Sequence, residues 1–536
     1  MASFILAGLS LGTLFTSGCN RKSASQSADP QVLRISQRNE PSDLDPALAT
    51  LPDDFFIIRA LSEGLVAPAP TNGAADASGQ VLPAAAERWE ISADGLTYTF
   101  HLRPDAHWSN GDPVTAMDFV DSYRRVLTPA TGAPKAAMFF AVKNAAAFAR
   151  GALPDFSQVG FRAPDTRTLE ITLHQPMPQF LVYVASGPWI PVNLRTVTRH
   201  GRKWTRPEHH VGNGPFKLTD WRPQQHVVVS KNPHYHAASA IKLDQIQFIA
   251  FSSGDAEDRA YRAGQIDITM AVPATKLEVY ARERPAELHR AALAETRYLT
   301  LNTTRPPLDD VRVRRALALA LDRRLLVGRV LLGGQQAAER FVPPMLLPAP
   351  EPDDVTNFSI RTDAIAARRL LSEAGFDGGE GFPSLELSSW PVGNPVLEVV
   401  QEMWKRELGI QVRLVSREAK VHLAALRDGE YDIGFITAIP DVPEAANILA
   451  DFISDSSGNY PHWSDATFDA LMSAADRDPA TRTERLHAAE SRLLQEAPLV
   501  PLYFNSTNWL MSPRVRGWQT DGLWTRFYRN VELSKN

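Results

Sequence analysis

The most constraining feature of the sequence is a strict alternation of apolar and polar side chains over residues 96–103. The apolar members are Leu96, Tyr98, Phe100 and Leu102. Side chains that alternate point to opposite faces of an extended chain, so this segment predicts a β-strand with one buried face. Asp94-Gly95 just before it is typical of a turn, and residues 168–173 repeat the alternation. These segments require a sheet that covers a core.

Other segments predict further strands and several helices. Strands are expected at residues 227–229, 246–251 and 410–415. Four segments carry apolar residues at helical spacing and finish at a residue that stops a helix. They run from Asp309-Asp310 to Gly333-Gly334, from Asp363 to Gly375, through Val396, Val400 and Trp404 to Gly409, and from Leu486 to Pro498. We interpret the apolar stripes as core packing, and the mixture predicts an α/β fold.

Composition narrows the class of protein. At about 100–200 residues per domain, 536 residues predict roughly three domains, and 44% hydrophobic residues exclude a wholly disordered chain. The 56 basic and 61 acidic residues give a net charge of −5, which excludes the basic surface of a nucleic-acid-binding protein. The single cysteine excludes a disulfide framework and a cysteine-based zinc site.

The N-terminal segment predicts export. Residues 4–15 are apolar or small, too few for a membrane-spanning helix but typical of a signal-peptide core. Thr16-Ser17-Gly18 leads to Cys19 and resembles a bacterial lipoprotein cleavage box. We expect residues 1–19 to be a signal peptide and Cys19 to be lipidated, with residues 20–30 as a polar tether. A free, buried cysteine is the alternative. The folded body is expected in the periplasm or on the outer face of the cell membrane.

Motifs of catalysis are missing from the folded body. It has no phosphate-binding glycine loop, no G-x-G-x-x-G and no H-E-x-x-H. His234-Tyr235-His236 could place two imidazoles on one face of a strand, but no third ligand at a telling spacing supports a metal site, so we interpret these as loop or surface histidines. We therefore expect no enzyme activity, no cofactor and no metal.

A series of motifs carries a family resemblance. Residues 86–90, 94–103 and 108–119 form its longest part, and the last of these reads Trp108-Ser109-Asn110-Gly111-Asp112-Pro113 at its start. Shorter matches follow the same order along the chain: residues 40–46, 63–65, 212–216, 231–235, 301–303, 311–317 and 404–409. The sequence resembles the extracellular solute-binding proteins, family 5, which are oligopeptide- and dipeptide-binding lipoproteins of ABC importers.

The resemblance implies an architecture. It is the α/β, two-lobed fold of type II (cluster C) periplasmic binding proteins, with an inserted domain and a hinged ligand cleft. Lobe I would comprise residues 31–69, 188–297 and 507–536, the inserted domain residues 70–187, and lobe II residues 298–506. Two crossing segments would act as the hinge, and a ligand would favour closure by contacting both lobes. The partners implied are a short peptide and ABC permease subunits, and we expect a monomer.

The resemblance also implies site residues. Asp441 stands where the oligopeptide-binding branch pairs an aspartate with the α-ammonium of the peptide; a turn aspartate between two prolines is the alternative. Thr437, Ala438 and Ile439 would pair with an extended peptide backbone, and Thr50, Leu51 and Pro52 would present backbone from the other lobe. Lys135 would meet a ligand carboxylate, with a solvated loop lysine as the alternative.

Several positions depart from that branch. Ala419 and Ala438 stand where the branch has pocket tryptophans, Leu426 and Phe435 where it has basic residues, and Lys135 where it has a tyrosine. The pocket walls are therefore expected to differ in size and charge. A peptide-binding protein of an ABC importer is the first hypothesis. The same fold binding an oligosaccharide, nickel chelate or haem is the second, and a secreted hydrolase of another fold is the third.

Overall fold

The computed structural model describes residues 30–37, 40–41, 43–71, 79–350, 360–390 and 394–534. The predicted signal peptide with Cys19, and the predicted tether except Pro30, lie outside the described residues. From Gln31 onward the chain forms one compact unit. None of the helices in the described part is long and apolar enough to cross a membrane.

The first sheet of this unit has four strands and is mixed. Its first strand runs parallel to the second, and the other pairs are antiparallel. In spatial order the strands are β1 (Val32–Gln37), β10 (Gln245–Ala250), β9 (His226–Lys231) and β8 (Phe216–Arg222). The helices of the same region are α1 (Pro52–Leu61), α5 (Leu194–His200), α6 (Gly254–Arg262) and α7 (Leu277–Glu283).

A second, antiparallel sheet belongs to the segment predicted as an inserted domain. Its strands, in spatial order, are β4 (Ala86–Ile91), β5 (Thr97–Leu102), β7 (Thr168–Thr172) and β6 (Phe161–Arg162). Helices α2 (Ala116–Leu127), α3 (Ala145–Ala149) and α4 (Phe180–Val184) accompany it, and the small hairpin of β2 (Val66–Pro68) and β3 (Val81–Pro83) precedes it. The buried residues of β5 and β7 are the apolar members of the two alternating segments, because those side chains share one face.

The third sheet has six strands. In spatial order they are β12 (Gln336–Ala337), β16 (Leu499–Leu510), β11 (Leu288–Leu301), β15 (Ile433–Ala438), β13 (Leu385–Ser389) and β14 (Val412–Ser416). The helices of this region are α8 (Val311–Leu319), α9 (Arg323–Leu325), α10 (Ala364–Glu373), α11 (Pro395–Leu408), α12 (Ala419–Arg427), α13 (Ala445–Leu449), α14 (Ala466–Arg477) and α15 (Arg482–Glu496). Near the C-terminus, β17 (Val515–Arg516) pairs with β20 (Glu532–Leu533), and β18 (Gln519–Thr520) with β19 (Arg526–Phe527).

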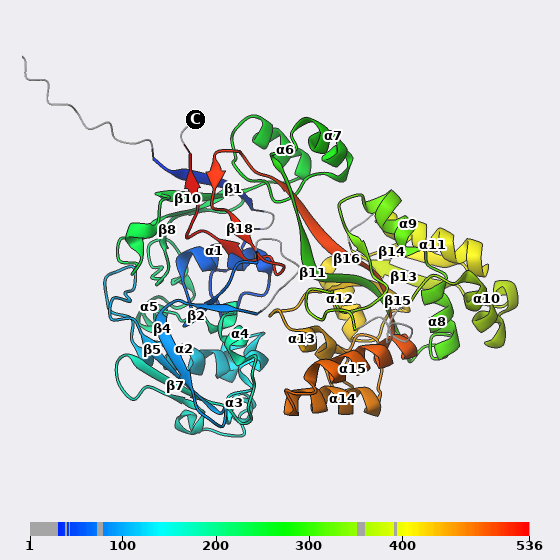
Figure 1. Cartoon of the computed structure of the whole chain (residues 1–536), viewed down its shortest axis with the longest axis horizontal. Coiled ribbons are helices and arrows are strands. Elements are labelled where there is room, and N and C mark those ends of the chain that lie inside the picture. The colour runs from blue at the N-terminus through cyan, green and yellow to red at the C-terminus, as the bar shows by residue number, and fades with distance from the viewer. Residues whose placement is uncertain are drawn as a thin grey trace, which may run out of the picture. The chain divides into compact units, whose positions relative to one another are not determined.

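Separate hydrophobic clusters lie under these sheets. One contains Leu33, Phe216 and Ile246, a second contains Phe100, Phe119 and Trp189, and a third contains Leu317, Trp404 and Leu493. The long strands β11 and β16 lie side by side and cross from the region of β1 and β10 to that of β13 and β15 (Figure 1). The predicted borders at residues 297/298 and 506/507 fall within these two strands, and the borders themselves stay a prediction.

Most predicted elements are present, and one helix differs. The strands at β5, β7, β9, β10 and β14 and the helices α10, α11 and α15 are confirmed. The helix expected from Asp309-Asp310 to Gly333-Gly334 is wrong as one element, because α8 ends at Leu319 and a π-helix covers Leu326–Leu331. Asp322 caps the next turn, and the buried Arg323 donates to the carbonyl oxygens of Ala318 and Leu321. These side chains therefore replace backbone hydrogen bonds that are lost where the helix is interrupted.

A buried ion pair in the third cluster gives a test of stability. Glu490 of α15 is fully buried; its Oε2 accepts from Arg340, and its Oε1 accepts from the N–H groups of Phe341 and Val342. Burial raises the pKa of Glu490, and Arg340 opposes that rise. Arg340→Met is expected to lower the free energy of unfolding by about 3–5 kcal/mol at pH 8, because it leaves a buried carboxylate unpaired.

The loss should be smaller at pH 5, because a protonated Glu490 carries no charge and needs no cation. Chemical denaturation at both pH values measures it. The exposed pair Arg369–Glu373 provides the control, with side chains 71% and 53% exposed, and Arg369→Met should change stability by less than about 0.5 kcal/mol. Equal losses in the two variants would contradict this account of the buried pair.

Candidate functional site

A cavity of about 600 Å³ is lined by segments from all three regions. That volume is in the range of small-molecule sites. The lining segments are the start of α1 with the loop before it, the β2–β3 hairpin, Lys135, the end of α4 with the residues after it, residues 439–443 and residues 521–525. Of the eight ligand-binding residues predicted from the sequence, six line this cavity: Thr50, Leu51, Pro52, Lys135, Ile439 and Asp441.

The wall formed by α1 is fixed by its N-terminus. Pro52 occupies the first turn, and the Asp54 carboxylate accepts a hydrogen bond of 3.4 Å from the Leu51 N–H. Proline lacks an N–H, so neither Leu51 nor Pro52 has a free main-chain donor. The exposed Thr50 therefore carries the N–H that this loop can offer to a ligand.

The opposite wall is the loop that follows β15. Pro440 and Pro443 flank Asp441 and restrict its backbone. The Asp441 N–H donates to Asn447 Oδ1 at 2.7 Å, and Glu444, which caps α13, pairs with Arg482 at 3.0 Å. The Asp441 carboxylate is thus presented on a rigid loop and remains 37% exposed.

Lys135 and Asp441 are direct partners. They are 306 positions apart in the sequence, and Lys135 Nζ forms an ion pair with Asp441 Oδ1 across the cavity. Lys135 precedes the short helix η2 (Ala136–Phe139) of the inserted region, whereas Asp441 follows β15. The two charges that the sequence assigned to different ends of a ligand therefore neutralise each other.

Thr437 and Ala438 are placed differently from the other six residues and do not line the cavity. They pair with Arg297 and Thr296 of β11, Thr437 Oγ1 donates to Glu295, and Ala438 is buried. On its other side β15 pairs with β13 only at Ile433 and Gly434. The backbone of Thr437 and Ala438 therefore has no β13 residue opposite it on that side.

Three positions that depart from the oligopeptide branch lie in the third hydrophobic cluster and not in the cavity wall. They are Leu426, Phe435 and Ala438.

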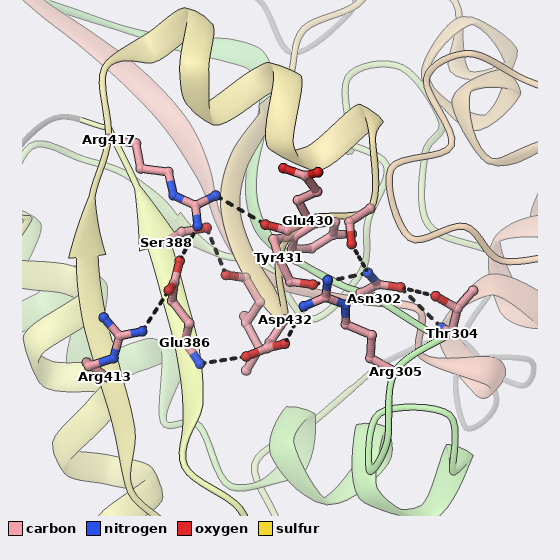
Figure 2. Close-up of polar contacts among 12 residues, drawn as sticks. Asn302, Thr304, Arg305, Glu386, Ser388, Arg413, Arg417, Glu430, Tyr431 and Asp432 are labelled. Atoms are coloured by element: carbon pink, nitrogen blue, oxygen red, sulfur yellow. Dashed lines mark hydrogen bonds and ion pairs between the residues drawn. The ribbon is translucent and has the colours of Figure 1, made fainter.

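A polar network fixes β15 at its other end (Figure 2). Asp432 accepts from the Glu386 N–H at 3.0 Å and pairs with Arg305 at 3.2 Å. Asn302 donates to the carbonyl oxygen of Tyr431 at 3.0 Å, and Glu386 in turn pairs with Arg417 at 2.6 Å. These contacts join β11, β13 and β15, so the strand that leads to Asp441 is held at its start by charge and at its end by Asn447.

A second contact reaches across the same region. The hydroxyl of Tyr183, on α4, interacts with the Asn447 side chain and lies near Glu444. Burial and the negative charge of Glu444 raise the pKa of Tyr183 to about 12, so its hydroxyl stays protonated at neutral pH. Asn447 therefore connects the inserted region to the loop that carries Asp441.

The remaining wall is a loop attached to β11. The ladder between β11 and β16 shifts register between Ala292 and Thr296, and within this bulge the Ala294 N–H donates to Gly522 O at 2.8 Å. Trp524, in the same loop, has a positive φ of 63°, a strained conformation for a bulky residue that is often associated with ligand sites. The long strands thus position residues 521–525 at the cavity.

Sequence reasoning missed Phe55, Arg59 and the loop of residues 521–525. In the sequence, Phe55 looks like an ordinary core residue of a helix. Arg59 looks like a basic residue that stabilises the C-terminal end of a helix through the helix dipole. Only the spatial arrangement identifies them as cavity residues. In the part of the chain that the structure describes, no group of three or more His, Cys, Asp and Glu could hold a metal ion, and His236 lies 2.8 Å from Glu63.

A cavity enclosed by segments from separate cores, with two long strands crossing between them, defines a two-lobed binding protein of the type II periplasmic kind. Residues 80–460 match the family model of the bacterial extracellular solute-binding proteins, family 5 (Middle), and the chain belongs to this family. This is a family of solute-binding proteins and not of enzymes.

Three relatives illustrate its range. The probable deoxycholate-binding periplasmic protein YgiS of Escherichia coli is 34% identical over 505 residues, 91% of each chain. The structure of the Escherichia coli murein tripeptide binding protein MppA matches with a TM-score of 0.82 at 30% identity, over 95% of this chain and 99% of that one. The Haemophilus influenzae OppA complex with the peptide RPPGFSPFR matches with a TM-score of 0.79 at 28% identity, over 95% and 99%.

The contact between Gly187 and Phe55 tests the shape of the cavity. Both residues line it, and a Cβ added at Gly187 would lie 2.0 Å from the Phe55 ring. Gly187→Ala should therefore displace the ring into the cavity and lower the free energy of unfolding by about 1–3 kcal/mol. Chemical denaturation measures this effect. Gly328→Ala is the control, because nothing lies within 4 Å of an added Cβ there, and its stability should be unchanged or slightly higher. A fully stable Gly187→Ala protein would disprove the tight contact.

Proposed function

We propose that this protein is the substrate-binding component of an ABC importer, which captures short peptides between its lobes and delivers them to a membrane permease. The observation that supports this best is the Asp441 carboxylate at the cavity, on a loop held by Asn447, where its ion-pair partner among the described residues is the partly exposed Lys135. A fixed anion whose partner can be exchanged is suited to the α-ammonium group that every unblocked peptide carries.

In this proposal the ligand ammonium replaces Lys135 Nζ on Asp441. The exchange is inexpensive, because an ion pair with side chains 22% and 37% exposed contributes about 0–1 kcal/mol. A ligand that fills the cavity excludes water from Asp441, and a hydrogen bond to a charged group then contributes about 1.5–3 kcal/mol. Lys135, once released, is free to meet a carboxylate of the ligand.

The main chain would supply the rest of the recognition. Thr50 offers its N–H from the side of α1, and Ile439 is exposed in the opposite wall. The edge of Thr437 and Ala438 beyond the β13 ladder is available for an extended backbone, which is a mode of binding that does not depend on peptide sequence. Closure would be favoured by a ligand that contacts both walls, and the Tyr183–Asn447 contact would link closure to the Asp441 loop.

The cellular setting belongs to the same proposal. The relatives named above include periplasmic proteins, so we place the folded body in the periplasm or at the outer face of the cell membrane, working as a monomer with permease subunits. Cys19 would carry a lipid anchor, with residues 1–19 as the signal peptide. Acyl mass on Cys19 and partitioning of the mature protein into detergent would support the anchor, and absence of both would remove it.

A non-peptide solute is the second candidate. A relative with 34% identity is named a probable deoxycholate-binding protein, and Leu51, Phe55, Val182 and Ile439 give the cavity apolar walls. Native mass spectrometry of the purified protein separates the candidates, because a closed cleft retains its ligand. A ladder of short-peptide masses supports peptide capture, whereas a single non-peptide mass supports the second candidate.

The role of Asp441 has its own test. Asp441→Asn should weaken binding of trialanine about 10- to 100-fold by isothermal titration calorimetry, because the ammonium loses its counter-charge. In the unaltered protein, N-acetyl-trialanine should be disfavoured against trialanine to a similar extent, and Asp441→Asn should bind the two alike. Asp428→Asn is the matched control, since Asp428 is 56% exposed and does not line the cavity. Equal binding of blocked and free peptides by the unaltered protein would refute this role.

A further inference from the structure

Arg59 places a second cation at the cavity. It lies in the last turn of α1, it is half-buried, and it lines the cavity together with Ala185, Ser186 and Asp521. Its Nη1 and Nη2 atoms both point to one carbonyl oxygen, that of Ala185, at 3.4 Å. This distance is beyond the usual range of an N–H···O hydrogen bond, so both contacts are weak.

The guanidinium has little compensation for its charge. Among the residues that the structure describes, no carboxylate forms an ion pair with Arg59. The acid that acts on it electrostatically is Asp521, but Asp521 Oδ1 already accepts from the N–H groups of Leu523 and Thr525. Burial lowers the pKa of Arg59, and the charge of Asp521 only partly opposes this effect.

The geometry of the donor indicates the missing partner. A guanidinium presents two parallel N–H groups that match the two oxygens of a carboxylate, and such bidentate pairs are among the strongest hydrogen bonds in proteins. A single carbonyl oxygen at 3.4 Å from both nitrogens occupies this fork without satisfying it. An anion that entered the cavity would find both donors available.

We infer that Arg59 is the binding position for a carboxylate group of the bound solute, so that the cleft selects short peptides with a negative charge within its reach. This inference rests on the proposed function. Asp441 would hold the amino end and Arg59 a carboxylate, which comes either from the C-terminus of a short peptide or from an acidic side chain. The site therefore favours peptides with a free carboxylate within reach of Arg59 over peptides in which that group is an amide.

The test compares peptides that differ only in one carboxylate. Trialanine is compared with trialanine amide for the C-terminus, and Ala-Glu-Ala with Ala-Gln-Ala for the side chain. The unaltered protein should bind the carboxylate member of at least one pair about 10- to 100-fold more tightly by isothermal titration calorimetry. Whichever pair shows the preference identifies the source of the carboxylate.

Variants assign that preference to Arg59. Arg59→Gln should lose most of the preference between the members of the pair, since Lys135 is then the cation that remains among the described cavity residues, and Arg59→Lys should keep more of the preference because it retains the charge. Arg324→Gln, at an arginine side chain that is 83% exposed and outside the cavity, should behave like the unaltered protein. Thermal unfolding of each variant verifies that it is folded.

The outcomes separate the two hypotheses. If peptides bind but Arg59→Gln keeps the full preference for the carboxylate, or if the unaltered protein shows no preference in either pair, the inference is overturned and the peptide function stands. If no peptide binds, the proposed function fails. In that case deoxycholate and its methyl ester replace the peptides: a preference for the free acid that Arg59→Gln abolishes supports the carboxylate position, and equal binding overturns it.

Discussion

The pairing of β11 with β16 is the constraint on which the site depends. The two strands run antiparallel from the Leu288–Leu510 pair to the Thr300–Leu499 pair and so connect regions with separate hydrophobic clusters. A bulge interrupts the ladder between Ala292 and Thr296. Two residues of the bulge bind the cavity walls. The Ala294 N–H donates to the carbonyl oxygen of Gly522 in one wall, and the Glu295 carboxylate accepts from Thr437 of β15, the strand that leads to the opposite wall. A bulge re-aims a strand locally, and here it joins both walls to the same crossing element.

The role of each charged group depends on how far it is buried and on which groups pair with it. Lys135 and Asp441 neutralise each other, but both remain partly exposed, and an ion pair of this kind contributes only about 0–1 kcal/mol. Glu490 and Arg340 are buried, and Glu490 is bound by backbone N–H groups as well. The first pair can therefore open at little cost, whereas the second contributes to folding. Arg59 lies between these cases, because its charge is partly withdrawn from water and no carboxylate pairs with it in the described structure.

The sequence predicted local structure well where one pattern decides it. The alternation at residues 96–103 and 168–173 became β5 and β7, and helices with a capping aspartate and a stopping glycine, such as α10, were located within a residue or two. The expected long helix after Asp310 failed because tertiary contacts override periodicity there. Arg323 is buried, and it binds the carbonyl oxygens that a continuous helix would have used. No local pattern contains that information.

The sequence brought together part of the candidate site. Asp441, Lys135, Ile439 and residues 50–52 line one cavity, whereas Thr437 and Ala438 are engaged with β11. By itself the sequence determined the elements, the family and the positions of candidate charges, because periodicity, capping and motif order are local properties of the chain. Only the tertiary structure decided which charges meet. The pairing of Lys135 with Asp441, 306 positions away, and the position of Arg59 beside the cavity depend on how three separately packed regions are joined through β11 and β16.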